Sequence, residues 1–453
     1  MSSSSAKSTK MGVVGLTIIV AVNMMGSGII MLPASLAKVG TISLLSWLVT
    51  ALGSMALAYS FAQCGFFVSR SGGMSAYAEE AHGKSSFFMA SYTYYLSLAI
   101  ANVAIAITAI GYLSPFVPWL SAAPVNTCIG VIALLWLTAI ANFRGARITG
   151  RISGVTVWGV IIPVATLAFF GWFWFDPHLF ASAWNVQHKP FGEAISSSIA
   201  LTLWAFLGME SACANSDAVE NPKKNVPIAV MAGTGIAAVI YILSTAAMQG
   251  IVPNHELANS SAPFGLAFSM LFSPALGSLV SLLAVVACTG SLLGWQFTIA
   301  QVSKAAADHG MFAKVFSAVN SKDAPVKGMV IVTVAQTLIS LMTISPSLNQ
   351  QFNTLVNLAV FTNVVPYILS LTALSAIMKK HGVAQATYVR NMIIVMVALI
   401  YSLYGIYASG TDAVFWGAIV MLAGYILYGL RADRFPSPVT DAGDRRRPLS
   451  DMP

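Results

Sequence analysis

Long apolar runs recur along almost the whole of this 453-residue chain, and they limit the folds that it can adopt. A run of about 20 apolar residues is long enough to cross the hydrocarbon of a bilayer as one helix. Continuous runs argue against a β-barrel, whose strands would alternate apolar and polar residues. The sequence therefore predicts an all-α integral membrane protein. We predict twelve spans, at about 11–37, 40–67, 85–114, 122–142, 152–175, 192–216, 226–252, 274–303, 328–344, 351–378, 388–409 and 412–430.

The basic residues are distributed unevenly between the two sides of such a membrane domain. If the N-terminus is cytoplasmic, 21 of the 23 lysines and arginines lie on the cytoplasmic side, and only Lys38 and Lys189 lie outside. This asymmetry follows the positive-inside rule and predicts that both termini are cytoplasmic. The net charge of +8 is then explained by topology, and we expect no nucleic-acid partner.

The predicted spans leave no room for a separate soluble domain. We expect a cytoplasmic segment at residues 1–10, one transporter-like membrane domain at 11–430, and a polar tail at 431–453. The tail combines prolines with a run of arginines, so we expect it to be disordered. The first apolar run is too long for a signal peptide and is predicted to stay uncleaved.

Two of the predicted spans are interrupted by glycine in the same way. Gly26-Ser27-Gly28 interrupts the first span, and Gly208-Met209-Glu210-Ser211 interrupts the sixth. Glycine is a poor helix former, so both stretches favour local unwinding. Glycine can also serve close helix packing, which is the alternative explanation.

The two interruptions occupy matching places in two five-span units, at about 11–175 and 192–378, which spans 11 and 12 follow. An odd number of spans makes the second unit inverted relative to the first. Paired interrupted helices in an inverted repeat are the best sequence indication of a transporter's binding site near the bilayer midplane.

Glu210 is the only charged residue between Ala194 and Asn215. An ionisable group at membrane depth costs about 3 kcal/mol or more, so a chain that keeps one usually uses it. Three roles stay open: binding an ammonium group of a cationic substrate, taking up and releasing a proton during transport, or serving as a satisfied structural carboxyl.

Other residues near the interruptions suit a zwitterion or an alkylammonium ligand. Unwound backbone at Gly26 to Gly28 offers N–H groups to a carboxylate. Trp204 and Trp295 can attract an alkylammonium group or simply pack. Asn102 is a polar residue deep in an apolar stretch. It can bind a ligand, and a structural hydrogen bond between helices is an equally good explanation.

No pattern for an enzyme or for a bound cofactor is present in the sequence. We find no HExxH or GxxxxGK[ST] motif, all six histidines lie in or near predicted loops, and the four cysteines lack CxxC spacing. We therefore expect no cofactor and no metal, with transport driven by a gradient or an exchanged solute. A membrane-embedded enzyme and a channel are the alternatives from other classes.

Four segments resemble the basic amino acid/polyamine antiporters of the amino acid-polyamine-organocation superfamily. The similarity spans roughly residues 10–430, and it implies a LeuT-type fold with a 5+5 inverted repeat, alternating access, an inner-membrane location and a homodimer. The segments that carry it are Asn23–Ile29, Trp204–Ala212, Asn221–Ala229 and Gly290–Trp295.

Within that family, Glu210–Asn215 and Ala141–Gly150 resemble the putrescine/ornithine branch. The resemblance implies exchange of putrescine for ornithine and leaves room for proton-coupled putrescine uptake. The arginine/agmatine and lysine/cadaverine branches are the nearest alternatives.

The resemblance also implies roles for individual residues. Gly26-Ser27-Gly28 would take the substrate carboxylate, the two tryptophans would flank the aliphatic chain, and Glu210 would be sensitive to protons or cations. Asn102 would lie near the distal cationic group, where Ser97 and Leu98 replace the small polar or sulfur residues of arginine-exchanging relatives. The full expected substrate site is Met25, Gly26, Ser27, Gly28, Tyr94, Ser97, Leu98, Asn102, Trp204, Leu207, Glu210 and Trp295.

Overall fold

The computed structural model describes residues 11–26, 28–68, 72–210, 219–345 and 347–430, and it leaves the side chains of 146–148 undescribed. Within these ranges the chain is helical, and its only extended pairing is an isolated bridge between Met11 and Val219. The helices are α1 (Val13–Met24), α2 (Leu32–Ala37), α3 (Ser43–Phe67), α4 (Gly73–His82), α5 (Lys84–Leu113), α6 (Pro124–Asn142), α7 (Ala146–Thr156), α8 (Trp158–Phe170), α9 (Pro177–Ser182), α10 (Phe191–Trp204), α12 (Pro222–Ile251), α13 (Asn254–Asn259), α14 (Pro263–Leu271), α15 (Pro274–Asp308), α16 (Val326–Met342), α17 (Leu348–Lys380), α18 (Gln385–Ala408) and α19 (Thr411–Gly429).

Nine helical stretches among the described residues are long and apolar enough to cross a membrane. Each coincides with a predicted span, so the chain is a multi-span membrane protein. The predicted first, sixth and ninth spans are absent from that set because α1, α10 and α16 have only 12, 14 and 17 residues. The first two are short because they end at the interruptions, and the total of twelve spans stays a prediction.

Several short helices lie in stretches that the apolar pattern left as loops. Among them, α4 lies between the second and third predicted spans, and α9, α13 and α14 lie in predicted outer loops. Such helices are too short and too polar to stand out as spans. Glycines with positive φ, Gly72 and Gly83, bound α4 and let the chain turn sharply at both of its ends.

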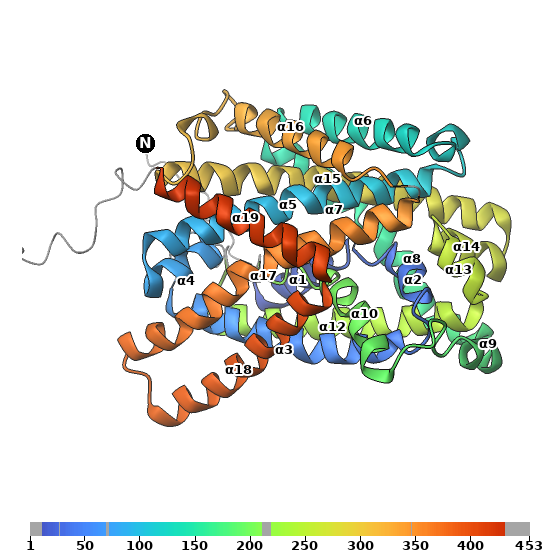
Figure 1. Cartoon of the computed structure of the whole chain (residues 1–453), viewed down its shortest axis with the longest axis horizontal. Coiled ribbons are helices and arrows are strands. Elements are labelled where there is room, and N and C mark those ends of the chain that lie inside the picture. The colour runs from blue at the N-terminus through green and yellow to red at the C-terminus, as the bar shows by residue number, and fades with distance from the viewer. Residues whose placement is uncertain (1–10, 27, 69–71, 211–218, 346, 431–453) are drawn as a thin grey trace, which may run out of the picture.

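The core of the molecule is built around α5 and α17. Of the most apolar window of each helix, 83% of the residues in α5 and 67% in α17 are buried, against 17% in α19. In Figure 1, α6 and α16 lie along one edge and α3 and α18 along the opposite edge, with α5, α15 and α17 between them. The two central helices are therefore the natural walls of an internal site.

The short helix α2 is covered at the end of the molecule that our predicted topology places outside. All six of its residues are buried. Ser35 Oγ donates to Asn353 Oδ1 of α17 at 2.7 Å, and Asn254 Nδ2 of α13 donates to the Ala37 carbonyl at 2.8 Å. Side chains from two other helices therefore fix α2 in place.

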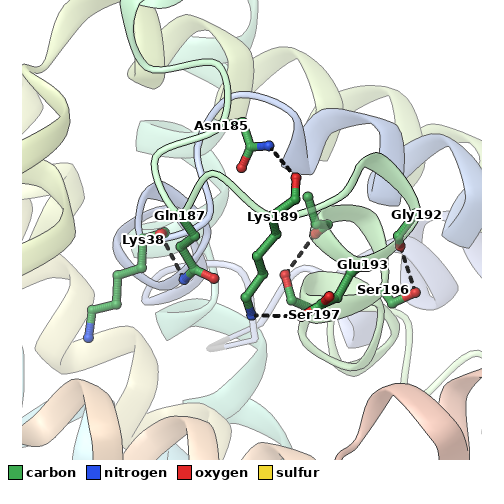
Figure 2. Close-up of polar contacts among 9 residues, drawn as sticks. Lys38, Asn185, Gln187, Lys189, Gly192, Glu193, Ser196 and Ser197 are labelled. Carbon is green, nitrogen blue, oxygen red and sulfur yellow. Dashed lines mark hydrogen bonds and ion pairs between the residues drawn. The ribbon is translucent and has the colours of Figure 1, made fainter.

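A loop at residues 183–190 closes over the chain just after α2. Gln187 Nε2 donates to the Lys38 carbonyl at 3.0 Å, as Figure 2 shows. The loop is braced internally, because Asn185 Nδ2 donates to the Lys189 carbonyl at 2.7 Å and the Lys189 ammonium pairs with Glu193 at 3.8 Å. This end of the molecule is thus closed by hydrogen bonds between segments distant in sequence.

Candidate functional site

Both helices end at the predicted glycine stretches, and the segments there pack against each other; Ser211 of the second stretch lies outside the described residues. In the first break (residues 25–31), the chain leaves α1 after Met24 and begins α2 at Leu32. In the second break (residues 205–210), α10 has ended at Trp204, and Gly208 adopts φ +107°, a conformation that favours glycine.

The glycines lie at the contact between the two segments. A Cβ placed on Gly28 would lie 3.6 Å from Ala205 Cα, and one on Gly208 would lie 3.4 Å from the Asn23 carbonyl oxygen. Each glycine thus faces backbone of the other interrupted segment. The two breaks therefore form one site rather than two.

A small cavity of about 40 Å³ lies between the breaks and the central helices. About 10–15 Å³ of volume of this kind holds one water, so the cavity has room for a few waters. The lining residues are Asn23, Met24, Gly26, Gly28, Ser97, Leu98, Ala101, Ile105, Trp204, Leu207, Gly208, Glu210, Trp295 and Asn363.

Among the described residues that line this cavity, Glu210 is the only charged one, and it is 5% exposed. Its Oε1 accepts a hydrogen bond from Tyr94 Oη at 3.1 Å, and its Oε2 accepts one from Tyr367 Oη at 2.7 Å. The Gly208 main-chain N–H also donates to Oε2, at 3.0 Å. A ligand cation must therefore share the carboxylate with these donors or displace one of them.

Tyr367 of α17 is a member of the site that the sequence did not reveal. A tyrosine in a long apolar helix usually packs against other side chains, and nothing in the adjacent sequence indicates a functional role for its hydroxyl. The one available signal is spacing: Asn363 precedes Tyr367 by four residues, so both lie on the same face of α17. That face is the one turned toward Glu210.

The two tryptophans expected at the site both line the cavity. Trp204 lies against the first break, with its Nε1 at 3.5 Å from the Cβ position of Gly28, and it meets Phe352 edge to face at 6.4 Å. Trp295 lies against the second break, 3.4 Å from the Cβ position of Gly208. Each indole thus covers one break.

The remaining predicted residues divide into three groups. Ser97, Leu98 and Leu207 line the cavity with the glycines, although Ser97 Oγ donates to the Ala359 carbonyl at 2.9 Å. Ser27 lies outside the described residues.

The last group is buried nearby without lining the cavity: it consists of Met25, Tyr94 and Asn102. Tyr94 reaches the site through its hydrogen bond to Glu210. Asn102 is fully buried, and neither of its side-chain polar atoms has a hydrogen-bond partner. Its neighbour Ala101, rather than Asn102 itself, forms part of the wall.

The described part of the chain holds no group of three or more His, Cys, Asp or Glu side chains that could bind a metal ion. Cys64, Cys128 and Cys288 are buried and form no disulfide with one another, and Cys213 lies outside the described residues. The described groups that can bind a ligand at the cavity are one carboxylate, hydroxyls, indoles and non-helical backbone.

Comparison with known proteins gives a consistent result over most of the chain. Residues 11–427 match the amino acid permease family. The chain is 59% identical over 432 residues to the putrescine transporter PotE of Escherichia coli K12, covering 95% of this chain and 98% of that protein.

Two further relatives are also transport proteins. The putrescine transporter PotE of Haemophilus influenzae is 57% identical over 431 residues, covering 95% of this chain and 99% of that protein. The cadaverine/lysine antiporter of E. coli K12 is 39% identical over 372 residues, covering 81% and 83%.

Proposed function

The chain belongs to the amino acid permease family, and on that premise we propose that it exchanges putrescine for ornithine across a bacterial inner membrane by alternating access. It is a transporter of small cationic molecules and not an enzyme, in agreement with the prediction from sequence. The identity to putrescine transporters is higher than that to the cadaverine/lysine antiporter, which favours putrescine as the diamine.

The observation that carries the proposal is the single carboxylate of Glu210 in a buried cavity between two broken helices. A lone buried carboxylate suits a cation, and the tyrosine and backbone donors around it keep it satisfied when the cation leaves. The apolar wall of Leu98, Ala101 and Ile105 suits a methylene chain.

The proposed roles follow from these positions. Main-chain groups of Gly26 to Gly28 bind the carboxylate of the amino acid, and Trp204 and Trp295 flank the chain. Glu210 binds an ammonium group or a proton during the cycle.

The proposed architecture has twelve spans in a LeuT-type inverted repeat. Both termini are cytoplasmic, and the protein is a homodimer in the lipid bilayer.

The exchange has a consequence for charge. Putrescine carries one more positive charge than ornithine near neutral pH, because it lacks the carboxylate. Exporting the diamine and importing the amino acid therefore moves positive charge outward. If ornithine is decarboxylated inside, the cycle also consumes cytoplasmic protons.

The nearest alternative is the same fold acting on arginine/agmatine or lysine/cadaverine. The 39% identity to a cadaverine/lysine antiporter supports lysine and cadaverine as the alternative substrate pair. A channel is disfavoured, because one buried carboxylate between two helix breaks fits an occluding site better than an open pore.

A reconstitution experiment tests the proposal. Purified protein is placed in liposomes loaded with unlabelled putrescine, and uptake of labelled ornithine, arginine and lysine is compared. We expect ornithine uptake that requires the internal load and exceeds uptake of the other two. Uptake that does not depend on internal putrescine would overturn the exchange mechanism. Equal uptake of ornithine, arginine and lysine would overturn the substrate assignment.

A further inference from the structure

Asn363 of α17 lines the cavity, is 1% exposed and was not expected from the sequence. Its Nδ2 lies near the Tyr367 hydroxyl, one helical turn further along, without a hydrogen bond of normal geometry. An unpaired buried polar group costs free energy, so it calls for an explanation.

Two buried amides outside the cavity are fully engaged. Asn142 Nδ2 donates to the Leu293 carbonyl at 2.9 Å, and its Oδ1 accepts from Thr149. Asn391 Oδ1 accepts from Tyr59 Oη at 2.8 Å, and its Nδ2 donates to Gln63 Oε1 at 3.4 Å. Asn102 is also buried and unpaired but does not line the cavity, so Asn363 is distinguished by its place in the cavity wall.

The position of Asn363 relative to Glu210 is set by the helix. It precedes Tyr367 by four residues, which places it about 6 Å along the same face of α17 from the residue that donates to Glu210. Ser97, on the facing helix α5, directs its hydroxyl to the Ala359 carbonyl. An amine bound at Glu210 therefore extends past an apolar wall toward the Asn363 amide.

We propose that Asn363 is a specificity-determining residue that contacts both substrates of the exchange. Its amide donates a hydrogen bond to the carboxylate of the amino acid and, after half a rotation about its last torsion, accepts one from the ammonium of the diamine. A carboxamide carries both donors and an acceptor, so it serves an anionic and a cationic group in turn. It does so without a second buried charge beside Glu210. This inference rests on the proposed function.

Three variants test it, with the KM for ornithine and for putrescine measured separately in liposomes. Asn363→Leu has similar volume and no polar atom, so both KM values rise by at least about tenfold. Asn363→Asp keeps the acceptor but repels a carboxylate. The KM for ornithine then rises by at least about tenfold, while that for putrescine stays within about threefold or falls.

The matched control is Thr362→Val. Thr362 is buried beside Asn363, does not line the cavity, and bonds only its own helix through the Leu358 and Ala359 carbonyls. Both KM values stay within about twofold of wild type, because only a local hydrogen bond is lost.

The outcomes separate this inference from the function on which it rests. If the wild-type protein exchanges neither substrate, the proposed function fails. If wild type and Thr362→Val exchange normally but Asn363→Leu leaves either KM within about threefold, the role of Asn363 is overturned. If Asn363→Leu does not elute as a monodisperse protein in detergent, Asn363→Asp decides, and an unchanged ornithine KM overturns the inference.

Discussion

The first break and the second break arise from similar glycine patterns, but their polar groups are satisfied in different ways. The first break leads into α2, which is fixed by scattered hydrogen bonds from α5, α13 and α17, including Tyr112 Oη to the Ile30 carbonyl at 3.0 Å. The second break concentrates donors from α5, α17 and its own backbone on the Glu210 carboxylate. A distributed set of bonds tolerates the loss of one member, whereas a concentrated set depends on one side chain.

The largest effect is expected at the carboxylate. Glu210→Gln keeps size and hydrogen-bonding capacity but removes the charge that binds an ammonium. Because a hydrogen bond to a charged group is worth about 1.5–3 kcal/mol, we expect exchange to fall by about 100-fold while the protein still folds. Transport in liposomes measures the first effect, and elution in detergent measures the second.

The control for this substitution lies on α10, the helix that leads into the second break. Glu193→Gln changes an exposed carboxylate at the start of α10 that pairs with Lys189 at 3.8 Å. Exposed pairs contribute about 1 kcal/mol or less, so exchange stays within about twofold. Equal losses in the two variants would contradict a concentrated role for Glu210.

The tryptophans lie at the contact between the two breaks and should give an intermediate effect. Trp204→Leu and Trp295→Leu keep apolar volume but remove the π face, which attracts a desolvated cation by about 1–2 kcal/mol. We expect each substitution to raise the KM for putrescine by about tenfold.

Trp136→Leu is the matched control, because Trp136 of α6 donates to Thr337 and does not line the cavity. The measurement is the initial rate of putrescine uptake over a range of concentrations. Unchanged KM values for both cavity variants would show that the indoles only pack.

The smallest effect is expected at the first break. Ser35→Ala removes the 2.7 Å hydrogen bond from α2 to Asn353 and leaves the other contacts of α2 in place. One such bond is worth about 1 kcal/mol, so exchange changes by about fivefold at most.

Hydrogen–deuterium exchange of residues 32–37 measures the loosening of α2 directly. It should speed up in Ser35→Ala and stay unchanged in Ser121→Ala, whose hydroxyl bonds only the nearby Pro118 carbonyl. A Ser35→Ala loss as large as that of Glu210→Gln would remove the distinction between the breaks.

The features that sequence could predict are those that depend on local chemistry. The pair Gly26 and Gly28 and the single Gly208 weaken a helix wherever it lies, and the lone charge of Glu210 is conspicuous in an apolar run. The ends of α1 and α10 near these glycines could therefore be predicted, together with the residues beside them.

The features that sequence could not predict depend on how helices face one another. Tyr367 and Asn363 belong to the site only because α17 packs against α5 in a particular rotation. The same packing turns the Ser97 hydroxyl toward Ala359 and buries Asn102 beside the cavity instead of in its wall. Apolar periodicity does not fix that rotation when a helix is buried on nearly all sides.

The size of the cavity bears on how much solvent the carrier must move. About 40 Å³ holds a few waters, since one needs about 10–15 Å³ of such volume. An amine that enters beside Glu210 therefore has only a small group of waters to displace. The carrier thus removes little solvent from its site in each turnover.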